Sequence, residues 1–174
     1  SRMFIAYTPQ EVHVLKAAGK KAIMLGVENG YAIGKDIENI ARFRKMGVSY
    51  ITLCHNGSND ICDSARGDAE WNGLSPFGKE VVRKMNESGI LVDISHAAES
   101  TFYDALETSA YPIIASHSSA RALCNHPRNL TDEQLKALAK QGGVAQICLY
   151  KGFINEEAEK ASLTDAIRHI DHIV

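Results

Sequence analysis

The stretch that decides the fold is YPIIASHSSARALCNHPRN, at residues 111–129. A short apolar run at 113–115 is typical of a buried strand, and it stops at Ser116 and His117. The polar loop that follows contains two serines, a second histidine and two arginines. A buried strand that ends in a histidine and a basic loop is how an α/β protein presents reactive groups to a cleft.

The same pattern of strand, polar loop and helix recurs along the chain. Short apolar runs predict strands at 22–27, 50–54, 90–94, 113–115 and 144–149. Capping signals predict helices that begin at Thr8-Pro9, Ser75-Pro76 and Thr131, and Glu11 is expected to complete a capping box with Thr8. Helical spacing predicts another helix over 33–43, and a polar loop at 58–73 is long enough to be a site wall. Strands that alternate with helices predict a parallel sheet.

Two α/β architectures fit this alternation. Five units suit a doubly wound open sheet, in which the site lies at one switch point. Polar groups of reactive character follow four different strands, however, and this favours a (β/α)8 TIM barrel. Such a barrel needs about 250 residues, and the chain has 174, so the barrel would be incomplete.

Four side chains are candidates for one site. Glu28, His55, His96 and His117 each come directly after a predicted strand or one residue later. Because parallel strands end on one face of a sheet, we expect these side chains to converge. A carboxylate and imidazoles suit zinc, and a carboxylate can bridge two metal ions about 3.5–4 Å apart. The alternative is that each is an ordinary hydrogen-bonded residue at a strand end.

Other residues of the opening stretch allow competing interpretations. A serine hydrolase would use Ser118 or Ser119 with a histidine and Asp93, but the chain has no G-x-S-x-G elbow. Asp93 lies inside its strand, so an orienting or structural role is expected. Arg128 is as consistent with a solvated side chain as with a carboxylate-binding one, whereas Arg121 is expected to be structural.

Composition excludes several classes of protein. Hydrophobic residues make up 45% and charged residues 23%, which is ordinary for a globular chain and argues against disorder. A net charge of -2 gives no electrostatic case for nucleic acid, and no apolar run approaches the roughly 20 residues of a membrane span. The four cysteines form no C-x-x-C pair, which favours free thiols and the cytoplasm. Periplasmic or secreted locations stay open.

Five motifs in series resemble the membrane (renal) dipeptidase family, zinc metallopeptidase family M19. They are GVENG (26–30), LCHNGSN (53–59), GLSPFGKEVVRKMN (73–86), LVDISH (91–96) and ASHSSARALCNHPRNLTD (115–132). The resemblance runs from about residue 23 to residue 149. It implies a (β/α)8 barrel, two zinc ions in the intact enzyme, and hydrolysis of dipeptides by a hydroxide that bridges the metals.

The resemblance also implies roles for individual residues. Glu28 matches the carboxylate that bridges the zinc ions, and His96 and His117 match the histidines on the second zinc. His55 resembles the histidine that contacts the substrate and stabilises the tetrahedral intermediate. Arg128 matches the arginine that binds the terminal carboxylate of the dipeptide, which favours it over Arg121.

The chain departs from the family in two places. The family's His-x-Asp pair is missing before Glu28, so the first zinc site is expected to be incomplete, and the Gly-x-Asp-Phe-Asp-Gly strand is missing as well. We therefore expect residues 1–174 to form a single domain that is an internal portion of the barrel. Weak or no activity and at most one tightly bound zinc are expected. Open strand edges predict aggregation or association with another chain, such as a homodimer.

Two further functions are consistent with these residues. One is a zinc amidohydrolase that acts on a cyclic amide or lactone. The other is a catalytically inactive binding protein that retains the fold.

Overall fold

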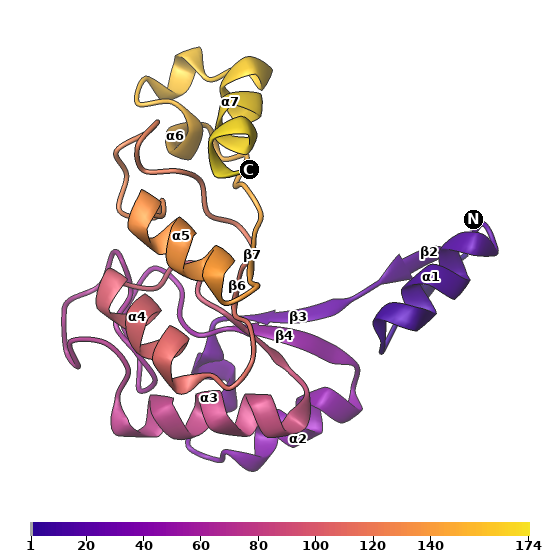
Figure 1. Ribbon diagram of the computed structural model, residues 1–174. Helices are drawn as coiled ribbons and strands as arrows, with labels where there is room; N and C mark the ends of the chain where they lie inside the picture. Colours follow the sequence, from indigo (N-terminus) through magenta and orange to yellow (C-terminus); the bar gives the residue numbers. More distant parts are fainter. Residues whose placement is uncertain (1) are drawn as a thin grey trace.

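Five parallel strands form the sheet that carries the candidate residues. The computed structural model describes residues 2–174 (Figure 1). The strand order follows the sequence and is β3-β4-β5-β6-β7. The strands are β3 (Leu25–Glu28), β4 (Val48–Thr52), β5 (Leu91–Asp93), β6 (Ile114–Ala115) and β7 (Val144–Ala145). Sequential parallel order is that of a (β/α)8 barrel, and within residues 2–174 the sheet does not close.

Helices connect these strands and cover the outside of the sheet. They are η1 (Gly30–Ile33), α2 (Glu38–Lys45), α3 (Pro76–Ser88), α4 (Glu99–Thr108) and α5 (Asp132–Lys140), followed after β7 by α6 (Lys151–Ile154), η2 (Ala158–Lys160) and α7 (Leu163–Ile173). The predicted caps of α3 and α5 are confirmed, with Ser75 accepting from Gly78 N–H and Thr131 forming a capping box with Gln134. The core between sheet and helices is mostly aliphatic, and Ile51, Val81 and the aromatic Phe102 are fully buried in it.

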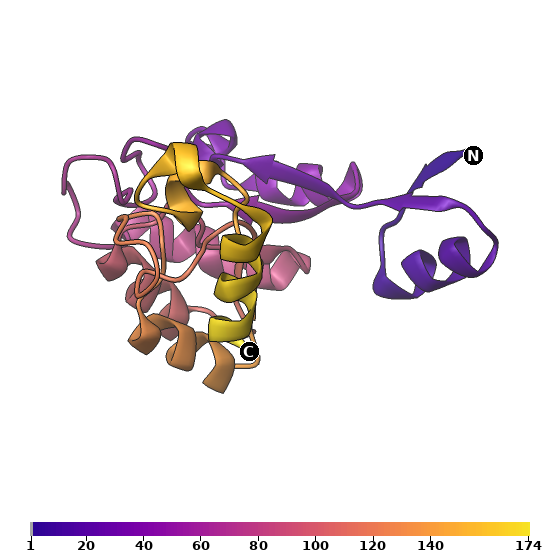
Figure 2. The same ribbon diagram turned by 90° about the horizontal axis from the view of Figure 1, so that it is seen from above.

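A small unit at the N-terminal end stands away from this body in both views (Figures 1 and 2). Strand β1 (Met3–Ile5) pairs in parallel with β2 (Lys21–Ile23), and α1 (Pro9–Ala17) connects them. Thr8 caps α1 as predicted, but Glu11 accepts from the N–H of Tyr7 instead of that of Thr8. The expected capping box is therefore wrong, although the helix start is correct.

The strand expected at 50–54 lies two residues earlier, at 48–52, and three other predicted elements are divided or shortened in the structure. The strand expected at 22–27 is divided at Met24, because β2 pairs with β1 whereas β3 pairs with β4. The helix expected over 33–43 is divided into η1 and α2, because Gly34 has a φ of 61° and Asp36 accepts from the N–H of Glu38. The strand expected at 144–149 ends at Ala145.

None of the helices within residues 2–174 is both long enough and apolar enough to cross a bilayer.

Candidate metal centre

The four candidate side chains lie at the carboxyl ends of neighbouring strands. Glu28 is the last residue of β3, and His55, His96 and His117 follow β4, β5 and β6. Parallel pairing brings these strand ends to one edge of the sheet. The predicted convergence is confirmed for all four residues.

Three of these side chains direct ligand atoms at the same point. Oε1 of Glu28 lies 3.2 Å from Nε2 of His96 and 3.2 Å from Nε2 of His117, and the two nitrogens are 2.9 Å apart. Nε2 of His55 lies farther out, 4.0 Å from the same oxygen, and its ring packs on that of His96 with centroids 4.3 Å apart. Two donor sets therefore share Glu28 and His96: His117 completes the tighter one, and His55 completes a wider one within 4.8 Å.

The backbone of His96 adopts an unusual conformation that the long loop at 58–73 holds in place. Its φ is 70°, in the left-handed region that non-glycine residues rarely occupy. The carbonyl oxygen of His96 accepts from Ala65 N–H at 2.7 Å and lies 3.2 Å from Oγ of Ser64. The same Oγ lies 2.5 Å from the carbonyl oxygen of His55. The loop therefore fixes the positions of two histidines, a role that its length alone could not reveal.

The turn after Glu28 is fixed by two asparagines. Asn29 has a φ of 80°, and its Oδ1 accepts from Tyr31 N–H and from the amide of Asn59, both at 3.1 Å. The Asn59 amide also donates to the carbonyl of Leu53 at 3.0 Å. The backbone approaches so closely here that a Cβ on Gly30 would lie 2.8 Å from the Leu53 carbonyl oxygen. These contacts link the end of β3 to the segment that carries His55.

Burial controls the charge of the two inner histidines. The side chain of His96 is 6% exposed, and burial, with Arg128 and His117 adding to it, lowers the pKa of His96 to about 3. Burial also lowers the pKa of His117, although Asp93 and Glu28 oppose the shift. Both imidazoles are therefore neutral near pH 7, which is the form that binds a metal ion.

The donor set fits a zinc ion. Two neutral imidazole nitrogens and a carboxylate oxygen lie 2.9–3.2 Å apart, and each can present a lone pair. A tetrahedral zinc ion with Zn–N bonds of about 2.0–2.1 Å holds its ligand atoms about 3.3 Å apart. The side chain of Glu28 is 53% exposed, so the site is open to solvent on one side.

Arg128 lies beside this cluster with a guanidinium that is incompletely hydrogen-bonded. The residue is 4% exposed, its Nη2 donates to the carbonyl of His117 at 3.4 Å, and its Nε is buried without a partner among residues 2–174. The guanidinium packs 5.1 Å from the ring centre of Phe153, and burial lowers its pKa. No carboxylate within the described chain pairs with it at salt-bridge distance.

Arg121 is bonded as a structural residue, as predicted. Its Nε donates to the carbonyl of Asn129 at 3.0 Å, its Nη2 donates to that of Pro127, and its Nη1 pairs with Glu99 at 3.3 Å. Arg121 therefore braces the loop that carries Arg128.

The serine hydrolase interpretation is not supported by the geometry. Oγ of Ser118 bonds to Ser95, and Oγ of Ser119 donates to the carbonyl of Cys148. Both serines are buried, and neither hydroxyl contacts an imidazole in the described part of the chain. Asp93 is buried among hydroxyls and backbone amides, consistent with the predicted orienting or structural role.

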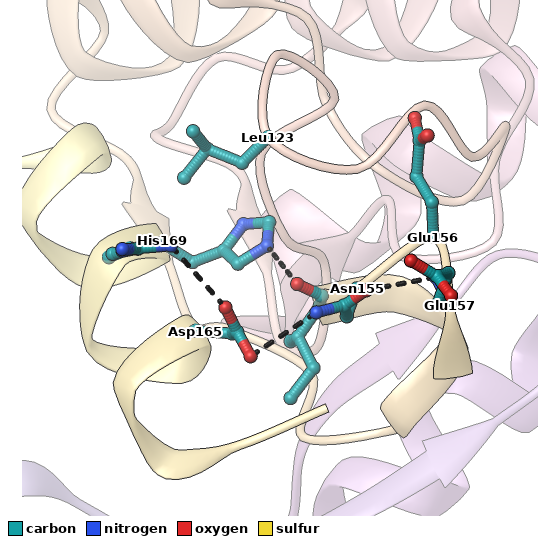
Figure 3. A pocket seen from close by; sticks show the side chains of 8 residues that line it. Leu123, Asn155, Glu156, Glu157, Asp165 and His169 are labelled. Atoms are coloured by element: carbon teal, nitrogen blue, oxygen red, sulfur yellow. Dashed lines mark hydrogen bonds and ion pairs between the residues drawn. The ribbon is translucent and has the colours of Figure 1, made fainter. Parts of the chain in front are cut away.

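A hollow of about 320 Å³ with mostly polar walls lies between the end of α6, the segment 155–157 that follows it, and α7 (Figure 3). His169 lines this hollow. Its Nδ1 accepts from Ala120 N–H at 3.0 Å, and its Nε2 lies 3.2 Å from the carbonyl oxygen of Ile154. Asp165 is engaged in capping α7, where it accepts from Ser162 and Asn155. The hydrogen bonds at this hollow thus hold the C-terminal helices together.

Known proteins of similar sequence and structure match nearly the whole chain. Dipeptidase tcpJ of Claviceps purpurea is 37% identical over 173 residues, which are 99% of this chain and 41% of the relative. An amidohydrolase from Pseudomonas aeruginosa superimposes with a TM-score of 0.92 at 28% identity, covering 98% of this chain and 52% of the other. A metallopeptidase from Rhodobacter sphaeroides, liganded with a phosphinate mimic of L-Ala-D-Ala, superimposes with a TM-score of 0.89 at 26% identity. The match covers 98% of this chain and 51% of the other.

The chain thus spans about two-fifths of the length of this curated relative and about half of the structural ones. A model of the membrane dipeptidases matches residues 1–174, the full length of the chain. The expected α/β barrel type and the sequence resemblance are both confirmed. The chain belongs to the membrane dipeptidase family, peptidase family M19.

Proposed function

We propose that this chain provides the metal-binding and substrate-binding face of a zinc-dependent dipeptidase. The observation that carries the proposal is the meeting of Glu28, His96 and His117 ligand atoms within 3.2 Å at the strand ends. Membership of a metallopeptidase family and a structural relative that holds a dipeptide mimic support the same assignment.

The proposed ligands of one zinc ion are Nε2 of His96, Nε2 of His117 and Oε1 of Glu28. Because the Glu28 side chain is half exposed, its carboxylate can be shared with a second ion, as expected for two zincs in the intact enzyme. Bound zinc would supply Lewis acidity and lower the pKa of a bound water.

His55 is the proposed catalytic residue that contacts the substrate. Its Nε2 is 4.0 Å from Oε1 of Glu28, and its side chain is 44% exposed, so it borders the centre while facing the open side. A donor at this place can stabilise negative charge on the carbonyl oxygen of the scissile bond, an effect that typically contributes about 3–4 kcal/mol.

Arg128 is the proposed binding residue for the free carboxylate of the dipeptide. A buried guanidinium without an anionic partner is unfavourable, and a substrate carboxylate would provide that partner. A planar guanidinium can bind a carboxylate through two parallel hydrogen bonds. Such a contact would orient the peptide bond toward the centre and select for short peptides.

Two alternatives make different demands on the same residues. One structural relative is named an amidohydrolase, and a cyclic amide or lactone would lack the free carboxylate that Arg128 is proposed to bind. Activity that is insensitive to Arg128→Ala would favour this alternative. A binding protein without catalysis would show no zinc at the centre even after the metal is supplied.

Zinc stoichiometry combined with hydrolysis of Gly-Leu and L-Ala-D-Ala tests the proposal. One tightly bound zinc that is lost in His117→Ala is expected for the chain of 174 residues, with weak or no turnover. An absence of zinc binding would contradict the proposed centre. Two stoichiometric zincs with full turnover would contradict the assignment of one complete ligand set to this chain. Measuring mass in solution would test the proposed association into dimers.

A further inference from the structure

Asp93, at the end of β5, lies beneath the candidate centre with its carboxylate fully buried. Its Oδ2 accepts from Oγ1 of Thr52 at 2.6 Å and lies 2.5 Å from Oγ of Ser116. Its Oδ1 accepts from the backbone N–H groups of Ser95 and Ser116 at 3.0 and 2.9 Å. Four donors thus surround one carboxylate, which joins the ends of β4, β5 and β6.

The hydroxyl of Ser116 lies between this carboxylate and the ring of His117. Its Oγ is 2.5 Å from Oδ2 of Asp93 and 2.7 Å from Nδ1 of His117. A hydroxyl has one proton to donate, and a carboxylate with four donors around it acts only as an acceptor. Ser116 therefore donates to Asp93, and its oxygen accepts a hydrogen from Nδ1 of His117.

This direction of hydrogen bonding determines the tautomer of His117. With the proton on Nδ1, a neutral imidazole has its lone pair on Nε2. That nitrogen is the atom 3.2 Å from Glu28 and 2.9 Å from His96. His117 N–H also donates to Oγ of Ser95 at 2.9 Å, so the backbone of the residue is fixed as well as its ring.

We propose that Ser116 is a positioning residue, which together with Asp93 holds His117 in the Nδ1–H tautomer and so prepares Nε2 for zinc. This inference rests on the proposed function, in which His117 is a zinc ligand. Partners that fix the second nitrogen of a ligand histidine typically change metal affinity 10- to 100-fold. His96 lacks such a partner within residues 2–174, because its Nδ1 is buried without a hydrogen bond.

The tautomer can be read without metal. We would label the chain with ¹⁵N, remove metal with a chelator, and record long-range ¹H–¹⁵N spectra of the imidazole rings with His117 neutral. The wild type is expected to carry its proton on Nδ1. Ser116→Ala is expected to give a mixture of tautomers, and Ser116→Thr, which keeps the hydroxyl, is expected to restore the Nδ1–H form.

Thr52→Val is the matched control because it removes a different hydroxyl from the same oxygen of Asp93 and leaves the partner of His117 intact. It should retain the Nδ1–H tautomer. Circular dichroism would confirm folding. If Ser116→Ala does not fold, Ser116→Cys, which keeps the volume and weakens both hydrogen bonds, gives the same comparison.

Zinc affinity, measured by competition with a chromophoric chelator, provides the second readout. A 10- to 100-fold loss is expected for Ser116→Ala, with recovery in Ser116→Thr and a much smaller change in Thr52→Val. The proposal is overturned if wild-type His117 is protonated on Nε2, or if Ser116→Ala retains both the Nδ1–H tautomer and the wild-type affinity. If the wild type binds no zinc, the proposed function fails, while the spectra still decide the tautomer.

Discussion

His96 Nε2 and His117 Nε2 lie 2.9 Å apart, although the two residues follow different strands of the sheet. Such an approach is unfavourable for two charged imidazoles, and burial keeps both rings neutral by lowering their pKa. The carboxylate of Glu28, 3.2 Å from each nitrogen, completes a triangle of lone pairs that a cation can satisfy.

Replacing His117 by alanine is expected to remove most zinc binding while leaving the fold intact, because its side chain is partly exposed and the backbone contact to Ser95 does not need the ring. Calorimetric titration with zinc measures the change. His13→Ala is the matched control, since His13 is an exposed residue of α1, outside the five-stranded sheet. Equal affinity in the two variants would exclude His117 as a ligand.

Arg128→Lys is expected to reduce kcat/KM for dipeptides by about 10- to 100-fold in active enzyme, corresponding to the roughly 1.5–3 kcal/mol of a charged hydrogen bond. Lysine keeps the charge but cannot form the bidentate contact. Kinetics with a dipeptide and with its C-terminal amide measure the effect. For the amide, which has no carboxylate, kcat/KM should fall much less. An equal fall in kcat/KM for both substrates would contradict carboxylate binding.

Gly30→Ala is expected to destabilise the turn after Glu28 by about 1–3 kcal/mol. The added Cβ would lie 2.8 Å from the carbonyl oxygen of Leu53 and 2.6 Å from the side chain of Ile61. Gly57→Ala is the control, because its Cβ would meet no atom within 4 Å. Urea unfolding of both variants measures the difference in the free energy of unfolding, and equal stabilities would show that the close approach at Gly30 is unimportant.

The positions of the candidate residues could be predicted from the sequence because the rule behind them is topological. Parallel strands end on one edge, so Glu28, His96 and His117 had to meet if each followed a strand. The predicted strand limits were less accurate, because β2 and β3 form one extended run that pairs with two different partners. The pattern of apolar residues indicates which residues are buried. It does not indicate which neighbouring strand a segment pairs with.

Other features depend on contacts between distant segments. The left-handed backbone of His96 is held by Ser64 and Ala65. Both residues lie more than thirty positions away along the chain. The tautomer of His117 depends on Ser116 and on a carboxylate from another strand. A single sequence shows which groups are present, but hydrogen bonds across loops become visible only when the chain is folded.

His169 gives a prediction on pH. Burial lowers its pKa most, and His172 adds to the shift, while the carbonyl of Ile154 and the carboxylate of Asp165 oppose it. The folded state therefore keeps His169 neutral at pH values where the unfolded chain, with a pKa of about 6.5, binds a proton. Stability should fall as the pH drops below about 6.5, with a slope from this group of at most about 1.4 kcal/mol per pH unit.

His169→Gln removes this titration while retaining a donor and an acceptor for the Ile154 carbonyl and the Ala120 N–H. Urea unfolding of wild type and variant across the same pH range measures the difference between their slopes. The variant should be less stable at neutral pH and should lose less stability on acidification. The contributions of His96 and His117 are present in both proteins and cancel in the comparison. If the free energy of unfolding depends on pH in the same way in both proteins, the burial of His169 does not make stability depend on its protonation.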